Sequence, residues 1–90
     1  MATIIRTDGT REHLTNLSLE SLQKEVGGYI ELVRVIIEGE ECTMYINEEG
    51  KVYNLPFNHE ATILYDNPYD IIVGNVVLFN REETLKDMGE

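Results

Sequence analysis

The sequence predicts a single small α+β domain, spanning residues 1–90, in which an antiparallel sheet carries two or three short helices on one side. Three observations predict it. A chain of 90 residues suits one hydrophobic core. Short runs rich in β-branched and aromatic residues are separated by tight-turn signals. Two stretches with helical spacing each follow a residue that can cap a helix.

The N-terminal part is predicted to be a hairpin followed by a helix. Residues 2–7 form the first strand, Asp8-Gly9 offers a tight turn, and residues 10–14 return. Ser18 can cap a helix that ends at the glycine pair 27–28, because glycine takes the left-handed position after a helix without steric cost.

The middle of the chain is predicted to hold three strands. Residues 29–37 form a long β-rich run with a bulge near Val33, because the polar residues Glu31 and Arg34 fall on opposite faces. After a charged turn, residues 42–46 form the next strand. Asn47 to Gly50 then favours a turn closed by a left-handed glycine, with residues 51–53 returning as a hairpin.

The last third is predicted to hold a helix, a central strand and a second helix. Asn58 can cap a helix from His59 to about Tyr65. Residues 70–79 are apolar on both faces, as in a central strand, and Gly74 within them suggests close approach of another backbone or a ligand. Residues 80–90 are predicted to form a charged C-terminal helix that begins with a capping box.

The net charge and the hydropathy of the chain limit the classes of binding partner that are expected. Seventeen acidic residues against seven basic ones give a net charge of −10, which repels phosphates, so direct nucleic-acid binding is not expected. No apolar run approaches the roughly 20 residues that span a bilayer, so no membrane partner is expected. The single cysteine and the lack of a visible secretion signal favour a cytoplasmic setting. Small domains often gain stability by self-association, so a homo-oligomer is expected.

The catalytic and metal-binding motifs that the sequence suggests are each incomplete. His59-Glu60 opens like a zinc-protease motif, but Ile63 stands where the second histidine is needed. Cys42 follows two glutamates, which disfavour a reactive thiolate. Two histidines and one cysteine do not complete a structural zinc site without carboxylates. We therefore predict a protein that is not an enzyme and holds neither metal nor cofactor.

Four segments together resemble a known family. They are Gly28-Tyr29-Ile30-Glu31, the run from Met44 to Lys51, Leu55-Pro56-x-Asn58-x-x-Ala61-Thr62-x-Leu64-Tyr65, and Asp70-x-Ile72-Val73-Gly74-Asn75-Val76. Their order and spacing resemble the domain of unknown function 3846 family, small phage and conjugative-plasmid proteins of unassigned function. The resemblance covers about residues 19–79, and the segments outside look peculiar to this chain. It implies a mobile-element product in a bacterial cytoplasm, of a kind that often counters host defences.

A small ligand site is predicted within these segments. Polar side chains on one face of the second helix, near the turn at Asn47 and beside Gly74, would meet where a backbone can approach closely. Tyrosine suits stacking on planar ligands, and Arg34 is a candidate cation. The predicted ligand-binding residues are Tyr29, Glu31, Arg34, Asn47, Asn58, Thr62, Tyr65 and Asn75. The alternative is that Asn58 only caps, Thr62 only packs and Asn47 only shapes its turn.

Two functions follow. In the first, the protein sequesters a small nucleotide-like signalling molecule of the host defence in a pocket at an oligomer interface. In the second, its acidic surface docks on a basic, nucleic-acid-binding cleft of a host or defence protein and blocks it.

Overall fold

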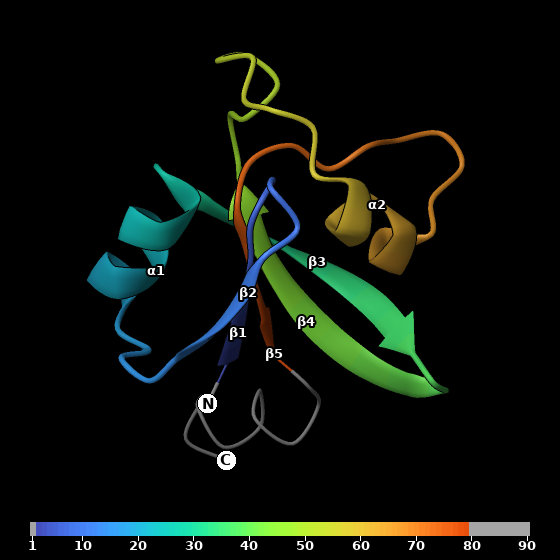
Figure 1. The fold of residues 1–90 in the computed structure, drawn as a ribbon, viewed down its shortest axis with the longest axis horizontal. Helices are drawn as coiled ribbons and strands as arrows, with labels where there is room; N and C mark the ends of the chain where they lie inside the picture. The colour runs from blue at the N-terminus through green and yellow to red at the C-terminus, as the bar shows by residue number, and fades with distance from the viewer. Residues whose placement is uncertain (1, 80–90) are drawn as a thin grey trace.

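A computed structural model describes residues 2–79, which form one five-stranded antiparallel sheet with a helix on each face (Figure 1). The strand order is β2-β1-β5-β4-β3. The elements in chain order are β1 (Ala2–Ile5), β2 (Arg11–Leu14), α1 (Leu19–Val26), β3 (Ile30–Ile37), β4 (Glu40–Asn47), α2 (His59–Tyr65) and β5 (Val76–Phe79). This confirms a small α+β domain with an antiparallel sheet. The predicted C-terminal helix lies outside the described residues.

The first hairpin and α1 form where local signals place them. Asp8 accepts hydrogen bonds from the backbone N–H and the hydroxyl of Thr10, at 2.9 and 2.7 Å, and so closes the turn between β1 and β2. The Ser18 hydroxyl accepts from the N–H of Ser21 at the start of α1. Gly27 ends the helix in the left-handed conformation, with φ of +85°. Local capping chemistry therefore defines both ends of this helix.

The hairpin of β3 and β4 is regular, so the predicted bulge near Val33 is wrong. Glu38 and Gly39 connect the strands with φ of 51° and 82°, the signature of a type I′ turn. The register then runs without interruption from Ile37–Glu40 to Ile30–Asn47. Since β3 is an edge strand, polar side chains on both of its faces reach solvent, and no bulge is needed to accommodate them.

The predicted hairpin at residues 42–53 is also wrong, because residues 48–54 form successive turns in place of a returning strand. Gly50 donates to the carbonyl of Asn47 at 3.2 Å, but its φ is not left-handed. The reason lies in the sheet. β4 already pairs with β3 on one side and with β5 on the other, so no edge is left for residues 51–53.

The helices lie on opposite faces of the sheet, and the prediction that they share one side is wrong (Figure 1). The connection from β2 to β3 carries α1 across one face, and the connection from β4 to β5 carries α2 across the other. The core under α2 contains Ile5, Val35, Cys42, Met44, Ala61, Ile72 and Val76. The core under α1 contains Ala2, Ile4, Leu22, Val26, Val77 and Phe79. Both faces of the central strands are therefore buried.

The central position predicted for the last strand is confirmed, but β5 is shorter than residues 70–79. Gly74, with φ of +80°, breaks the strand, and only an isolated bridge joins Phe57 to Val73 before it. A Cβ on Gly74 would lie 2.8 Å from Cδ1 of Leu55. Gly74 therefore permits the close approach that the sequence suggested, and the group that approaches is a leucine side chain.

Gly74→Ala should lower the free energy of unfolding by about 2 kcal/mol, through left-handed strain and displacement of Leu55. Urea denaturation measures the loss. Gly9→Ala is the matched control, since Gly9 has a φ of +89° but nothing within 4 Å of its would-be Cβ. It should cost less than Gly74→Ala. Equal losses would show that Leu55 accommodates the added methyl group.

Candidate functional site

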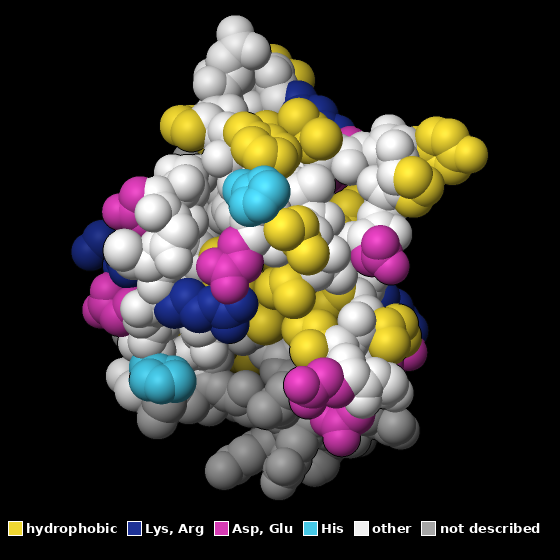
Figure 2. All heavy atoms as spheres, turned by 45° about the vertical axis from the view of Figure 1, so that its right-hand side comes forward, with side chains coloured by type: hydrophobic (Ala, Val, Ile, Leu, Met, Phe, Trp, Pro, Cys, Tyr) yellow, Lys and Arg dark blue, Asp and Glu magenta, His cyan; other side chains and the backbone are white. Residues whose placement is uncertain are grey.

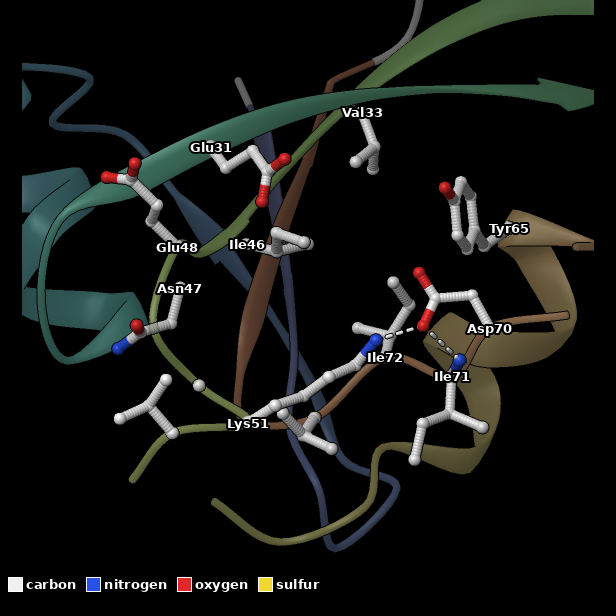
Figure 3. A pocket seen from close by; sticks show the side chains of 13 residues that line it. Glu31, Val33, Ile46, Asn47, Glu48, Lys51, Tyr65, Asp70, Ile71 and Ile72 are labelled. Carbon is white, nitrogen blue, oxygen red and sulfur yellow. Dashed lines mark hydrogen bonds and ion pairs between the residues drawn. The ribbon is translucent and has the colours of Figure 1, made fainter. Parts of the chain in front are cut away.

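A cleft of about 160 Å³ opens where β3, the end of β4 and the loops around α2 meet (Figure 3). We call it the acidic cleft. Its lining residues are Glu31, Val33, Ile46, Asn47, Glu48, Gly50, Lys51, Val52, Tyr65, Asp70, Ile71, Ile72 and Val73. They come from four separate segments of the chain, so only the tertiary fold assembles this site.

The floor of the acidic cleft is apolar. Val33 of β3, Ile46 of β4 and Ile72 of the loop between α2 and β5 point into it (Figure 3). Ile72 is only 2% exposed, and Val33 and Ile46 are half-buried against the core under α2. Such a floor can hold the aliphatic part of a ligand but offers no hydrogen bond.

An ion pair closes one side of the acidic cleft. The Nζ of Lys51 donates to Oδ1 of Asp70, and the N–H of Ile71 donates to the same oxygen at 2.8 Å. These two bonds, first the one from Lys51 and then the backbone one, lower the pKa of Asp70, so this carboxylate is ionised at neutral pH. Among residues 2–79, nothing hydrogen-bonds its second oxygen, which stays available to a ligand.

Glu31 and Tyr65 supply the other polar groups. The carboxylate of Glu31 turns toward the centre of the acidic cleft, whereas Glu48 turns away (Figure 3). Within the described part of the chain, Glu31 has no ion-pair partner. The hydroxyl of Tyr65 accepts from Nδ2 of Asn67 at 3.5 Å, which leaves its own proton free to donate. The lining therefore carries three carboxylates and a single, already paired ammonium.

Free cations are scarce across the described surface. Four of the five lysines and arginines in residues 2–79 are in ion pairs, namely Arg6–Glu12, Arg11–Glu60, Arg34–Glu41 and Lys51–Asp70. The fifth, Lys24, lies in the last turn of α1. A phosphate group would need several unpaired cations together, and this surface does not present them.

Exposed apolar side chains lie on the rim of the acidic cleft and on the neighbouring α2 face. Val52 and Ile71, on its rim, are 76% and 46% exposed. Figure 2 brings the α2 side of the molecule forward and shows apolar and acidic side chains interspersed there. The other exposed large apolar residues of α2 and its flanking loops are Tyr53, Phe57, Ile63 and Tyr69. A face of this kind is typical of a protein interface.

A second cleft of about 310 Å³ lies between the end of α1 and the turns after β4. Its lining is Gln23, Gly27, Gly28, Tyr29, Asn47, Glu49 and Tyr53. Tyr29 and Tyr53 are about two-thirds exposed. Asn47 belongs to the walls of both clefts. Its Nδ2 donates to the carbonyl of Val26 at 3.1 Å, and its Oδ1 accepts from the N–H of Glu49 at 2.8 Å.

The structure separates the predicted ligand residues into groups. Glu31, Asn47 and Tyr65 all line the acidic cleft, and of these the sequence predicted only that Tyr65 lies near the turn at Asn47. Tyr29 lines the second cleft. Arg34 lies apart from both, on the opposite face of β3 from Glu31, with its side chain 73% exposed and paired with Glu41 at 3.2 Å.

Like Asn47, three further predicted ligand residues bond the protein's own backbone. Asn58 is fully buried and donates to the carbonyls of Ile5 and Gly74. The hydroxyl of Thr62 accepts from the N–H of Ile72 at 2.8 Å and bonds the carbonyl of Asn58 at 2.8 Å. The side-chain oxygen of Asn75 accepts from the N–H of Thr7 at 3.1 Å. The polar atoms of Asn47, Asn58 and Thr62 hold the loops in place, as the alternative expects, and ligand binding by these residues stays a prediction.

Sequence reasoning did not find Asp70 as a site residue. The sequence predicts that it begins a strand, and its partner Lys51 is nineteen positions away in a different loop. No local pattern links the two.

Within residues 2–79, no three His, Cys, Asp or Glu side chains are grouped to hold a metal ion. Neither described helix has the length and apolar character needed to cross a bilayer.

Comparison with known proteins gives one result. A family model described as "Domain of unknown function (DUF3846)" matches residues 1–88. No curated protein and no solved structure matches the chain. The matched range includes the hairpin of β1 and β2 and the residues after β5, so the family pattern extends on both sides of residues 19–79.

Proposed function

The chain belongs to the DUF3846 family, whose description assigns no activity, and on this premise we propose a non-enzymatic binding protein whose acidic cleft receives a basic side chain of a protein partner. One observation carries the proposal. The carboxylate of Glu31 and the open oxygen of Asp70 converge above an apolar floor, beside the ring of Tyr65. An arginine or lysine side chain has the matching form, an aliphatic stem that ends in hydrogen-bond donors.

The size of the acidic cleft supports a side chain over a whole small molecule. Its volume of about 160 Å³ is well below the roughly 300–1,000 Å³ of drug-sized ligand pockets. Exposed Val52 and Ile71 on the rim would pack against apolar neighbours of the inserted side chain. A protein partner supplies both kinds of contact at once, which a free cation does not.

The same charges disfavour a nucleotide-like ligand. Tyr29 and Tyr53 could stack on a planar ring in the second cleft. The phosphates would then meet Glu49 and the carboxyl end of α1, where the helix dipole is negative. Sequestration of a nucleotide-like signal stays a prediction, and the acidic surface favours the other hypothesis, docking on a basic cleft of a host or defence protein in the bacterial cytoplasm.

Glu31→Gln should weaken the binding of a peptide with one central arginine about tenfold, or ~1.4 kcal/mol, because one charge-assisted hydrogen bond is lost. A titration with the peptide, followed by the methyl NMR signals of Val33, Ile46 and Ile72 on the floor of the acidic cleft, measures the affinity. Added salt should weaken binding as well, since both partners are charged.

Glu40→Gln is the matched control for charge. Glu40 lies on β4, opposite Ile37 at the far end of the same hairpin, and is exposed. This variant should bind the arginine peptide within about twofold of the parent, because the site is distant from the lost charge. Equal weakening by both variants, or tighter binding of a nucleoside phosphate than of the peptide, would contradict the proposal.

A further inference from the structure

The outer edge of β3 is a long, regular strand edge. β3 has eight residues and ends the strand order, and in residues 2–79 only β4 pairs with it. Proteins usually blunt such edges with proline, bulges, inward-pointing charges or very short strands. The run Ile30–Ile37 has no proline, its charged residues Glu31 and Arg34 are exposed, and its register with β4 is continuous. This edge therefore stays competent to pair with another strand.

The register shows which backbone groups face outward. The N–H of Glu48 donates to the carbonyl of Tyr29 at 2.9 Å, so these opposed residues form a hydrogen-bonded pair. Such pairs recur at every second residue of an antiparallel ladder. Ile37 and Glu40, which close the two-residue turn, fall in the same series. The odd-numbered residues of β3 thus bond to β4. The residues that direct their N–H and C=O outward are Ile30, Leu32, Arg34 and Ile36.

The two faces of β3 differ in chemistry. On the α1 side, Leu32 and Ile36 are 42% and 64% exposed, and Arg34 between them is tied to Glu41. On the α2 side, Glu31 and Val33 line the acidic cleft. A strand added at this edge would therefore meet apolar side chains on one face and the acidic cleft on the other.

From this arrangement we infer that the partner adds an extended segment to β3 as a sixth strand and inserts one basic side chain from it into the acidic cleft. The inference rests on the proposed function. The partner residue opposite Glu31 faces the acidic cleft, and the residues before and after it face the side of Ile30 and Leu32. The recognised sequence is thus an apolar–basic–apolar triplet in extended conformation. Opposite Arg34, a neutral or acidic residue fits best.

A second copy of this chain fits the same edge poorly. Two copies would each bring a net charge of −10. In an antiparallel pair, directly opposed residues share a face, but Arg34 and Glu31 lie on opposite faces of β3. Self-pairing therefore never places Arg34 of one copy opposite Glu31 of the other. A basic partner strand gains both the backbone bonds and the charge pair.

Amide hydrogen exchange on the labelled protein tests this inference, with the peptide Ser-Thr-Val-Arg-Val-Thr-Ser as the probe. At saturation, exchange at Leu32 and Arg34 should slow at least tenfold, because their amides face the added strand. Exchange at Val33 and Val35 should change little, because their amides already bond to β4. Slowing at Leu32 and Arg34 with protein concentration alone would assign the edge to a second copy and overturn the inference.

A backbone-methylated peptide separates the two proposals. N-methylation of the amides that face β3 removes the hydrogen-bond donors of the added strand, and the methyl groups prevent its close approach, while every side chain is kept. This peptide should still shift the methyl signals of Val33 and Ile46, but bind at least tenfold more weakly than its parent. Equal affinity of the two peptides would overturn the strand addition and leave the proposed function intact. Binding of the parent peptide without any methyl shift in the acidic cleft would instead overturn the proposed function.

Discussion

Asn58→Ala should lower the free energy of unfolding by about 4 kcal/mol, the largest loss expected from any single substitution considered. The side chain is fully buried. Its Nδ2 donates to the carbonyls of Ile5 and Gly74, at 3.0 and 2.9 Å, and its Oδ1 accepts from the N–H of Ala61. Alanine leaves the buried carbonyl of Gly74 without a donor, at about 1–3 kcal/mol, removes the additional bond to the carbonyl of Ile5, at about 1 kcal/mol, and removes a helix cap worth about 1 kcal/mol.

Urea denaturation measures the loss against two further variants. Asn16→Ala removes one exposed turn bond, to the N–H of Ser18, and should cost less than about 1 kcal/mol. Asn58→Asp keeps the acceptor for α2 but sets a carboxylate against two carbonyl oxygens, so it should destabilise strongly at neutral pH. A loss below about 1.5 kcal/mol for Asn58→Ala would mean that Asn58 acts only as a cap.

Asn47→Ala should cost about 2–3 kcal/mol and weaken the site as well. The residue is 6% exposed and ties the last turn of α1, at Val26, to the turn after β4, at Glu49. Its removal leaves a buried carbonyl without a donor and frees the segment that carries Glu48 and Lys51. Binding of the arginine peptide should therefore weaken although Asn47 itself carries no charge.

Two measurements check this prediction. Urea denaturation gives the stability loss, and amide exchange at Glu49 should become faster as its bond to Oδ1 disappears. Asn47→Asp is the matched variant. It keeps the acceptor for Glu49 but loses the donor to Val26 and places a negative charge at the carboxyl end of α1, which is unfavourable. A stability equal to that of the parent would contradict the role assigned to Nδ2.

The parts of the fold that sequence reasoning predicted well are those with local causes. Ser18 and Asn58 cap their helices through side chains that bond within three residues. Gly27 ends α1 because its left-handed φ carries no steric cost. These signals are complete within one turn of the chain, so helix bounds can be read from the sequence without knowledge of the sheet.

The wrong predictions of the fold concern features that depend on contacts between residues far apart in the sequence. The turn chemistry at Asn47 to Gly50 is typical of a hairpin, but the amide of Asn47 reaches Val26, twenty-one residues earlier. Each helix packs on the face of the sheet that its connection crosses, and which face that is depends on the positions of strands far away in the sequence. Central strands apolar on both faces are compatible with helices on either side, so no pattern in the sequence separates the two arrangements.

In the candidate site, too, the features with local causes could be predicted, and those that depend on distant residues could not. Polar residues of the family segments were predicted to meet, and several do. Thr62 meets the backbone of Ile72, however, and Asn75 meets Thr7, so their hydrogen-bonding capacity is used inside the fold. Whether a buried amide serves a ligand or a loop depends on which carbonyl lies beside it, which only the folded backbone decides.

The position of β5 has a consequence for the order of assembly. The two hairpins, β1 with β2 and β3 with β4, touch the same strand but not each other, because β5 lies between them. During synthesis each hairpin can form as soon as it leaves the ribosome, yet the sheet stays in two halves until Val76 to Phe79 emerge. A nascent chain stalled before that point would hold two further open strand edges, on β1 and β4, the natural targets of a chaperone.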